Sequence, residues 1–304
     1  MNRREFLHGA IAAAPLLAAP FGTGRALAAG RDWGLQLFTV IAPLEKDFEG
    51  TLAAVAQLGY RTVETIGSFG RDPALVRRLF DRHGLTSPSQ HLAPPALYAS
   101  FSAWTRREIS TEQNRDTYAA ALGLDQVDTV VADGIRTAHA LGQRYVVWPI
   151  LMPPHLASRE MVDGYIRAFN RAGEMCAKAG LTFAFHNHHR EFARLGDAVI
   201  YDLILAGTDP ALVKMEMDLY WVSKAKADPL AYLQNHPGRF KLAHVKDMAA
   251  DGDFAVVGAG VLDLPGLIRA ADRAGIEHLY VEYDRSDDPL RDVRDARTYL
   301  DRLG

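Results

Sequence analysis

Short apolar runs alternate along the chain with longer segments whose apolar residues recur at helical spacing. We interpret the runs as buried strands and the longer segments as amphipathic helices. Each predicted strand is followed by a predicted helix up to the C-terminus. The predicted strands cover residues 34–40, 61–66, 87–92, 144–150, 181–188, 213–218, 241–247 and 279–284.

An open, doubly wound sheet is the main alternative to a closed barrel. That fold places a glycine-rich phosphate-binding turn directly after its first strand, but the segment FTVIAPLEKD at this place has no glycine. The pattern Gly258-Ala259-Gly260 comes late and follows no strand-to-helix junction of that kind. We therefore predict an α/β chain folded as a (β/α)8 TIM barrel over residues 29–304. Within it, residues 93–110, with two prolines and several aromatic residues, predict a lid or long loop.

Residues 1–28 have the order of a secretory signal. Arg3 and Arg4 precede a mildly apolar, alanine-rich run, and Ala26-Leu27-Ala28 provides a cleavage site. The run is too short, and too interrupted by proline and glycine, to span a membrane. The paired arginines resemble a twin-arginine signal, so we expect export to the periplasm and a mature chain that starts at Ala29.

Composition and charge exclude some functions. The 304 residues are 48% hydrophobic and 23% charged, with a formal net charge of −3. This balance gives no reason to expect nucleic acid or an anionic membrane as a partner. The single cysteine, Cys176, cannot form an internal disulfide and lies in a helical pattern, where we expect it to be buried.

Side chains suited to binding a metal occur where four of the predicted strands end. Successive residues of a strand face opposite sides, so His186 and His188 share the face that we place inside the barrel. The same alternation places Asp218, His244 and Glu282 inside, at the ends of three later strands. Because the carboxyl ends of barrel strands lie at one rim, we expect these side chains to meet there.

Two imidazoles and two carboxylates are typical ligands of one divalent metal ion. This set suits Mn, Zn, Co or Fe(II) better than Ca or Mg. A lone histidine at a strand end is usually a hydrogen-bonded structural residue, so the prediction depends on the four occurring together. His188 is the alternative to His186 as the ligand from the fifth strand.

Other residues near the same rim are candidates for catalysis or substrate binding. Lys246 shares a face with His244 and is a candidate acid or base, unless it only pairs with Glu282 or Asp284. Aromatic side chains suit the apolar faces of sugar rings, although plain barrel packing is the alternative. The candidates for substrate binding are Phe38, Glu64, His91, Trp148 and Trp221.

We expect several nearby polar residues to have structural roles instead. Asn187 is expected to fix a loop, Asp247 to stabilise a turn and Asp263 to cap a helix. His189 and Glu191 are expected to face solvent or to cap the next turn.

The chain resembles the xylose isomerase-like TIM barrel superfamily of sugar isomerases, epimerases and inosose dehydratases. The resemblance covers essentially the whole mature chain, through the segments LQLFTV, VET, HNHHREF, EMDLYW, HVKDM, VGAGVLD and VEYD. It implies one divalent ion, often manganese, bound by side chains that end strands five to eight. That role falls on Asp218, His244 and Glu282, with His186 at the place where the keto-hexose epimerases have a glutamate.

This departure bears on the mechanism that the resemblance implies. The epimerases use two metal-bound glutamates, one on each face of the substrate, and His186 replaces one of them. We expect a metal-polarised carbonyl, with Glu282 taking the adjacent proton. Lys246, His188 or Glu64 would return that proton or protonate a leaving oxygen. Isomerisation, epimerisation and elimination all begin in this way, so the sequence leaves the three open.

The expected export bears on the substrate. Phosphorylated sugars are cytoplasmic, and the strand-end loops show no cluster of Arg or Lys and no glycine-rich phosphate cradle. We therefore predict a metal-dependent isomerase or epimerase, or a related lyase, that acts on an unphosphorylated sugar or keto-sugar. The alternatives are a non-catalytic sugar-binding barrel and a metal-dependent hydrolase or nuclease. The resemblance also allows a homo-oligomer, because a neighbouring subunit often completes the lid loops of such barrels.

Overall fold

The structure, a computed structural model, describes residues 31–303 and contains a closed barrel of eight parallel strands. The barrel strands are neighbours in chain order, and the last closes on the first. The predicted fold class is therefore confirmed. The barrel strands are β1 (Gly34–Gln36), β2 (Thr62–Ile66), β3 (Thr86–His91), β4 (Tyr145–Trp148), β5 (Thr182–His186), β8 (Val213–Asp218), β9 (Phe240–Val245) and β12 (His278–Val281).

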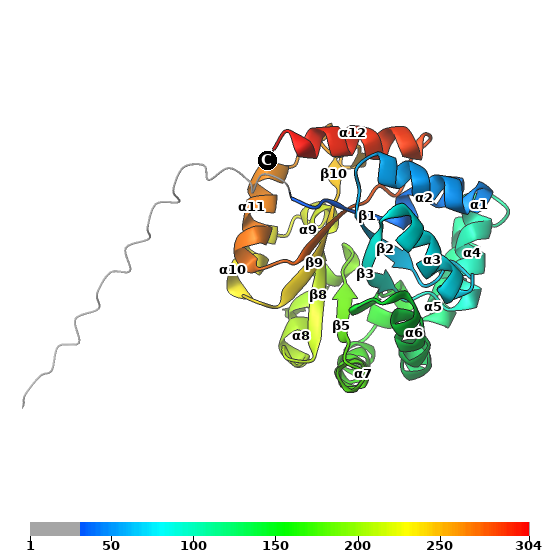
Figure 1. Ribbon diagram of the computed structural model, residues 1–304. Coiled ribbons are helices and arrows are strands. Elements are labelled where there is room, and N and C mark those ends of the chain that lie inside the picture. The colour runs from blue at the N-terminus through cyan, green and yellow to red at the C-terminus, as the bar shows by residue number, and fades with distance from the viewer. Residues whose placement is uncertain (1–30, 304) are drawn as a thin grey trace, which may run out of the picture.

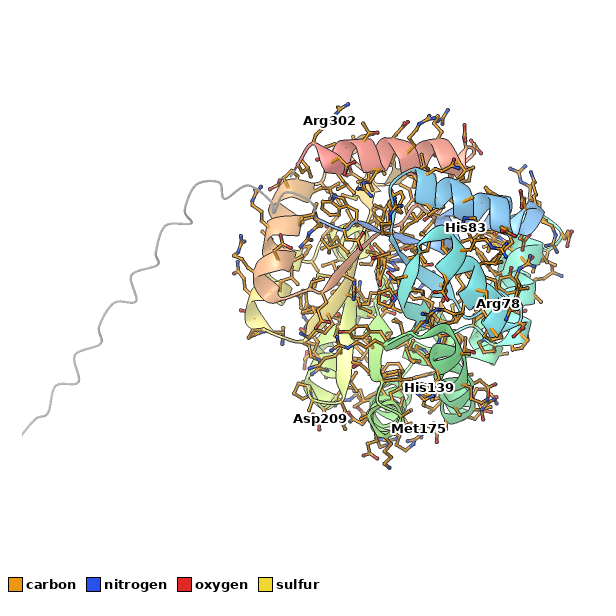
Figure 2. The ribbon with its side chains drawn as sticks, viewed as in Figure 1. Arg78, His83, His139, Met175, Asp209 and Arg302 are labelled. Atoms are coloured by element: carbon orange, nitrogen blue, oxygen red, sulfur yellow. The ribbon has the colours of Figure 1, made fainter. Side chains whose placement is uncertain are left out.

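Helices surround these strands as an outer ring (Figure 1). Exposed residues such as Arg78, Asp209 and Arg302 lie on the outside of the ring (Figure 2). The helices that follow the strands are α1 (Ile41–Lys46), α2 (Phe48–Gln57), α3 (Pro73–His83), α6 (Val127–Leu141), α7 (Arg159–Lys178), α8 (Ile200–Gly207), α9 (Leu219–Lys224), α10 (Pro229–Asn235), α11 (Leu264–Ala274) and α12 (Pro289–Asp301).

The segment predicted as a lid or long loop is largely helical, so the long-loop alternative is wrong and the lid stays a prediction. It forms α4 (Pro95–Thr105), and α5 (Thr111–Ala121) follows, so that both helices lie between β3 and α6. Pro94 is the N-cap of α4 and Pro95 its first residue, where the missing N–H of proline costs nothing. Ser110 and Gln113 form a capping box that starts α5.

The first strand ends earlier than the sequence predicts. β1 stops at Gln36, and Leu37–Val40 form a 3-10 helix. The Gln36 side chain accepts a hydrogen bond from the Phe38 backbone N–H at 3.1 Å and caps this turn. Phe38 therefore lies on a helical turn at the rim of the barrel.

The interior of the barrel changes from apolar to polar along the strands. Tyr145, Ala184, Leu242 and Tyr280 form an inner apolar cluster, separate from the core between the barrel and the helices. Ser89 donates a hydrogen bond to the Tyr280 hydroxyl at 2.8 Å within this layer. The polar layers lie beyond it, toward the carboxyl ends of the strands.

Two predicted structural roles are confirmed in the loops. Asp247 accepts hydrogen bonds from the backbone N–H groups of Gly258 at 3.0 Å and Gly260 at 2.9 Å, and so stabilises the glycine-rich turn. Asp263 accepts from the Gly266 N–H at 3.0 Å and caps α11. Short two-stranded sheets also occur in loops: β6 (Arg194–Leu195) with β7 (Ala198–Val199), and β10 (Asp247–Met248) with β11 (Phe254–Ala255).

None of the helices between residues 31 and 303 has the length and apolar character needed to cross a bilayer. Cys176 is buried, as predicted. The signal predicted for residues 1–28 lies outside the described residues.

Candidate functional site

Four side chains of metal-ligand type meet at the carboxyl end of the barrel. His186 ends β5, Asp218 ends β8, His244 lies near the end of β9 and Glu282 directly follows β12. One potential ligand atom from each of the four lies within 4.8 Å of the others, and all four residues are buried. The structure thus brings together the residues that the sequence suggested as one ligand set.

The atoms of this set that face one another make no hydrogen bond of acceptable geometry among residues 31–303, although Lys246 forms ion pairs with the two carboxylate oxygens. The facing atoms are His186 Nε2, Asp218 Oδ2, His244 Nδ1 and Glu282 Oε2. His244 Nδ1 lies only 2.7 Å from Glu282 Oε2, but their directions do not make a satisfactory hydrogen bond. A buried polar atom without a partner costs about 1–3 kcal/mol and is rare. A divalent cation among them would satisfy all four, so the residues present fit a metal ion.

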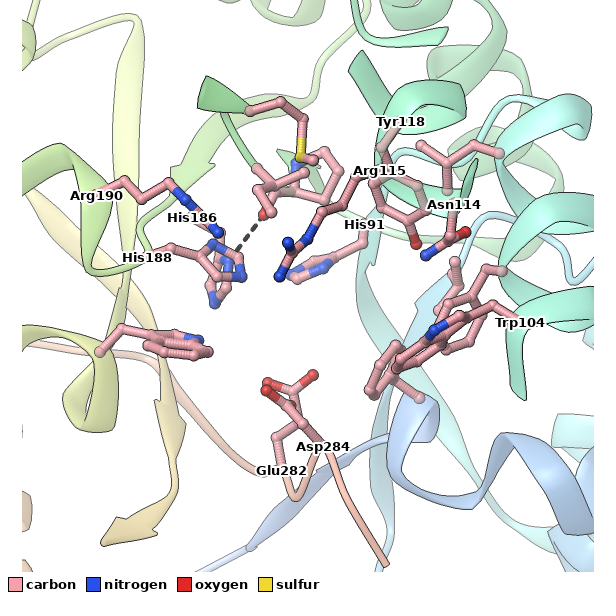
Figure 3. A pocket seen from close by; sticks show the side chains of 18 of the residues that line it. His91, Trp104, Asn114, Arg115, Tyr118, His186, His188, Arg190, Glu282 and Asp284 are labelled. Carbon is pink, nitrogen blue, oxygen red and sulfur yellow. Dashed lines mark hydrogen bonds between the residues drawn. The ribbon is translucent and has the colours of Figure 1, made fainter. Parts of the chain in front are cut away.

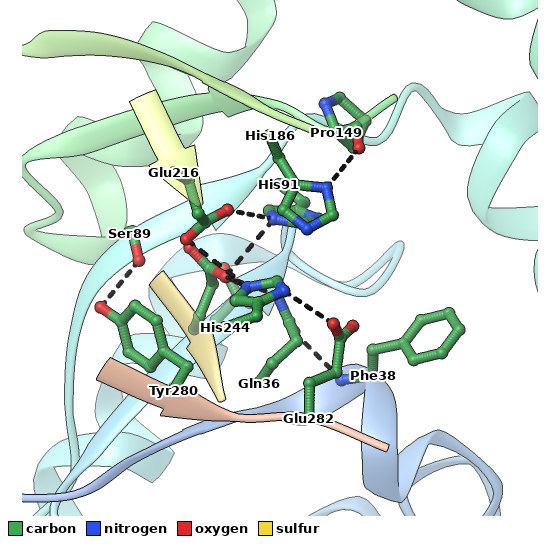
Figure 4. A network of polar contacts seen from close by, with 12 residues as sticks. Gln36, Phe38, Ser89, His91, Pro149, His186, Glu216, His244, Tyr280 and Glu282 are labelled. Carbon is green, nitrogen blue, oxygen red and sulfur yellow. Dashed lines mark hydrogen bonds and ion pairs between the residues drawn. The ribbon is translucent and has the colours of Figure 1, made fainter. Parts of the chain in front are cut away.

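Hydrogen bonds on the far side of each ring orient the two histidines (Figure 4). His186 Nδ1 donates to the Pro149 carbonyl at 2.9 Å, and His244 Nε2 donates to Glu64 Oε2 at 2.8 Å. When each ring is neutral, as metal binding requires, the opposite nitrogen is an acceptor that points into the ligand set. Metal-binding histidines are commonly held in this way. Burial alone would lower the pKa of His244, but Glu282 and Glu216 raise it well above its usual value, so a metal ion would displace a proton from this ring.

A second polar layer lies beneath the ligand set. His91 Nε2 lies 2.7 Å from Glu216 Oε2 and 3.4 Å from Glu64 Oε2, and Gln36 donates to Glu64 at 2.8 Å. Burial raises the pKa of Glu216 and lowers the pKa of His91 to about 3. Glu64 is fully buried and does not border the cavity, so it contacts His244 instead of a substrate. The suggestion that Glu64 binds substrate is therefore not supported.

Atoms of this lower layer make a second possible ligand group. His91, Glu216, His186 and His244 each place one potential ligand atom within 4.8 Å of the others. This lower group shares His186 and His244 with the ligand set of His186, Asp218, His244 and Glu282. Of the two groups, only the ligand set includes Glu282, which borders the cavity beside Lys246.

Lys246 lies among three carboxylates. Its Nζ is 3.0 Å from Asp218 Oδ2, 2.7 Å from Glu282 Oε2 and 2.8 Å from Asp284 Oδ1. Burial alone would lower the pKa of Lys246, but these carboxylates raise it well above its usual value. Burial also raises the pKa of Asp284 to about 6, against the opposing effect of Lys246. Lys246 therefore carries its charge at neutral pH and borders the cavity as part of an ion-pair network.

His188 lies at the edge of the cavity and is not part of the ligand set. Its ring centroid is 4.9 Å from that of His186 and 5.3 Å from that of Trp221. Burial lowers the pKa of His188 well below its usual value, so the ring is neutral. Its Nδ1 is buried without a hydrogen-bond partner among the described residues, while the side chain borders the cavity.

The loop that carries His188 is fixed by two buried side chains. Glu191 accepts a hydrogen bond from the His188 backbone N–H at 3.0 Å, and Asn187 Oδ1 accepts from the Asp218 N–H at 3.3 Å. The expected role of Asn187 in fixing a loop is thus confirmed. Glu191 is fully buried, so the solvent-facing alternative is wrong for it, and its backbone hydrogen bond in the turn agrees with the other alternative. His189 lies against Trp221, with the ring planes tilted by 32° and the ring centroids 5.0 Å apart.

A cavity of about 370 Å³ is bordered by His186 and Glu282 of the ligand set (Figure 3). Phe38, His91 and Trp221, which the sequence suggested as substrate-binding residues, border it. Its other walls come from α4, α5 and the segments that follow the barrel strands. A cavity of this size lies within the roughly 300–1,000 Å³ of typical small-molecule sites.

Trp148 does not border the cavity, contrary to the sequence-based expectation. Its ring lies between the barrel and α7, with centroids 6.4 Å from Tyr165 and 5.8 Å from Phe169. Tyr145 and Val147 are the β4 residues that point into the barrel. Alternation along the strand therefore turns Trp148 outward.

Two arginines that the sequence reasoning missed also border the cavity. Arg115 comes from α5, and Arg190 from the turn that follows β5 (Figure 3). Burial, and then the nearby charge of Arg115, lower the pKa of Arg190. Neither forms an ion pair with a carboxylate of residues 31–303 within 4 Å. The sequence shows no Arg/Lys cluster in the strand-end loops, but the fold places two arginines at one cavity, because α5 brings Arg115 toward Arg190.

Comparison with known proteins agrees with this architecture. The profile of the xylose isomerase-like TIM barrel family matches residues 52–303. An inosose dehydratase from Geobacillus thermodenitrificans is 23% identical over 278 residues, which cover 84% of this chain and 89% of that protein. The rhizopine catabolism protein MocC of Rhizobium meliloti is 23% identical over 258 residues, which cover 75% of this chain and 71% of that protein.

Solved structures show the same fold. A sugar phosphate isomerase/epimerase from Parabacteroides distasonis has a TM-score of 0.72 and 26% identity, covering 95% of this chain and 98% of that chain. An L-ribulose 3-epimerase has a TM-score of 0.61 and 16% identity, covering 89% of this chain and 93% of that chain. The chain belongs to the xylose isomerase-like TIM barrel family.

Proposed function

We propose that this protein is a divalent-metal-dependent isomerase or epimerase that removes a proton next to the carbonyl of a sugar or keto-sugar. The observation that carries the proposal is the convergence of four buried side chains of metal-ligand type, two of which, His186 and Glu282, border the cavity. Two imidazole and two carboxylate ligands suit manganese, zinc, cobalt or iron(II), and we propose manganese. Fold neighbours named as epimerases support the reaction class.

Each residue of the site has a role in this proposal. His186, Asp218, His244 and Glu282 would hold the ion, which supplies a Lewis acid that polarises the substrate carbonyl. Burial alone would raise the pKa of Glu282, but His244 and Lys246 lower it well below its usual value. The Glu282 carboxylate is therefore ionised at neutral pH and able to accept a proton.

His188 is the proposed second base. It is neutral, and it projects into the cavity from the β5 side, whereas Glu282 projects from the β12 side (Figure 3). Epimerisation requires proton removal on one face of the substrate and return on the other. Two proton-accepting groups on different walls of one cavity suit that requirement.

A lyase is the second candidate. The position of the charged Lys246 beside Glu282 favours it. In an elimination, a base takes the proton next to the carbonyl, the C–O bond one carbon further on breaks, and the leaving oxygen takes a proton. Lys246 is charged and lies 2.7 Å from Glu282, so a proton donor and a base occur side by side. Relatives named inosose dehydratase support this candidate.

The metal content of the protein tests the divalent metal site, on which both candidate functions depend. We would purify the mature chain without chelators and measure metals by mass spectrometry, alongside Asp218→Asn and the control Asp263→Asn. Asp263 only caps α11, and asparagine is an equally good cap. We expect about one metal ion per chain in the wild type and the control and much less in Asp218→Asn. An equal metal content in all three proteins would refute the proposed site.

Reaction class is tested separately in deuterium oxide. An isomerase or epimerase places deuterium next to the carbonyl of a keto-sugar, whereas a lyase releases water or an alcohol and leaves an unsaturated product. Metal-loaded protein that binds sugars tightly but causes neither change would indicate a non-catalytic sugar-binding barrel.

We propose an unphosphorylated substrate because we expect the protein to be exported. The positions of Arg115 and Arg190 at the cavity argue against an unphosphorylated substrate, because two guanidinium groups suit an anionic group. Competition by inorganic phosphate would decide: strong inhibition that Arg190→Gln removes would favour a phosphorylated or carboxylated substrate. Export itself is tested by cell fractionation, in which replacement of Arg3 and Arg4 by lysine should retain the precursor in the cytoplasm.

A further inference from the structure

The cavity has two chemically different halves. The polar half is lined by His186 and Glu282 of the ligand set, together with Lys246 and His188. The other half is apolar and is built mainly by α4, by the last residue of β2 and by the segments that follow β1 and β3. The apolar half consists of Phe38, Ile66, Leu92, Leu97, Phe101 and Trp104.

Three aromatic rings make the apolar half a continuous surface. Phe38 stacks on Phe101 with ring centroids 4.5 Å apart, and Phe101 lies 5.9 Å from Trp104. Phe101 is buried, whereas Phe38 and Trp104 are only partly buried. Phe101 therefore supports the other two rings, whose remaining surface faces the cavity.

A sugar ring alone does not explain this half of the cavity. Sugars carry a hydroxyl group on most carbons, and each hydroxyl that loses water without gaining a hydrogen bond costs free energy. The polar half already offers several hydrogen-bonding side chains and the ligand set. The six apolar residues offer no side-chain hydrogen bond except through the Trp104 indole N–H, which already donates to Thr111 at 3.1 Å.

We propose that the apolar half binds the aromatic aglycone of a glycoside whose sugar ring lies on the ligand set. The proposal rests on the proposed function and names its substrate class. Both halves belong to one cavity of about 370 Å³, so a ligand that reaches from one to the other needs no rearrangement. An aromatic group gains offset or edge contacts with Phe38 and Trp104 as well as hydrophobic burial.

A glycoside substrate also limits the chemistry of the polar half. The anomeric carbon of a glycoside is blocked, so its ring does not open to a free aldehyde or ketone. Aldose–ketose isomerisation through the open chain is then excluded. Epimerisation or elimination next to a ring ketone is compatible with a glycoside.

Binding of paired glycosides tests the aglycone site. We would titrate the metal-loaded protein with methyl β-glucopyranoside and 4-nitrophenyl β-glucopyranoside by calorimetry. These probes share the sugar ring and differ in the aglycone. We expect the aryl glycoside to bind at least tenfold more tightly, which corresponds to about 1.4 kcal/mol. Equal affinities would overturn the proposal while leaving the proposed function intact.

Matched tryptophan variants locate the preference. In Trp104→Ala the aryl preference should fall to less than threefold, with binding of the methyl glycoside unchanged. In Trp221→Ala, on the side of His188, both affinities should change by the same factor. A preference that survives in Trp104→Ala would overturn the proposed location.

Two further outcomes also count against the aglycone site. If neither glycoside binds although metal is present, the proposed sugar site fails and the aglycone site fails with it, whereas the metal site stands. If the protein is a dimer that Trp104→Asp dissociates, a second copy of the chain covers the apolar half. Sedimentation of the wild type and that variant distinguishes this case.

Discussion

Glu191 offers a sharp test of the electrostatics beneath the candidate site. Its side chain is fully buried and accepts one hydrogen bond from the His188 N–H, while Oε1 has no partner among the described residues. Burial raises the pKa of Glu191 to about 7, although the backbone hydrogen bonds, His186 and Arg190 oppose the shift. The buried carboxyl is thus largely neutral below pH 7 in the folded protein.

The sign and size of the effect follow from this shift. A carboxyl whose folded-state pKa is raised contributes stability that is fully present below its unfolded pKa of 4.5 and is lost as the pH rises through about 7. A shift of roughly 2.5 pKa units corresponds to about 3 kcal/mol of unfolding free energy. Glu191→Gln should remove this loss, because the amide is neutral at every pH.

Urea unfolding at pH 5 and pH 8, with chelator present, measures the effect. Relative to the wild type, Glu191→Gln should gain about 2–3 kcal/mol more unfolding free energy at pH 8 than at pH 5. The exposed Glu174→Gln on α7 is the matched control and should show the same difference at both pH values. If Glu191→Gln behaves like Glu174→Gln, the carboxyl is ionised with an ordinary pKa and the reasoning is wrong.

Three further predictions concern packing, a turn and the ligand set. Trp148→Ala should lower the unfolding free energy by about 3–5 kcal/mol but leave the KM for any substrate unchanged. An altered KM in steady-state kinetics would show that Trp148 does contribute to substrate binding. Asp247→Ala leaves the Gly258 and Gly260 N–H groups without their acceptor and should cost at least about 2 kcal/mol in urea unfolding, whereas a neutral effect would mean that water replaces the carboxylate. Metal affinity should fall at least about tenfold between pH 7.5 and pH 5.5, because the histidine ligands must lose their protons to bind. Competition with a chelating dye measures that fall, and a flat profile would argue against His186 and His244 as ligands.

The sequence was sufficient for the fold and for the gathering of the ligand set. In β5, β8 and β9, polar residues alternate with apolar ones near the strand end, and this alternation reports which face is inside. The assignment of Trp148 failed because β4 is apolar on both faces, as is common for strands covered on both sides. Such a strand carries no alternation from which the inner face can be read.

Features that depend on contacts between distant segments were not predictable in the same way. The Pro94-Pro95 pair is equally consistent with a loop and with a helix start, and only packing on the barrel selects α4. Arg115 and Arg190 are 75 positions apart in the numbering, and only α5 brings them to one cavity. Burial of Glu191 follows from the course of the turn after β5, which its neighbours in sequence do not specify.

The division of the cavity has an evolutionary consequence. The ligand set comes from β5, β8, β9 and the end of β12, whereas much of the apolar half comes from the α4–α5 hairpin inserted after β3. If relatives exchanged that hairpin, the range of molecules that bind in the apolar half would change, and no residue of the ligand set would move. Diversification of specificity in such barrels can therefore proceed by replacing one contiguous stretch of gene, with the reactive machinery inherited unchanged.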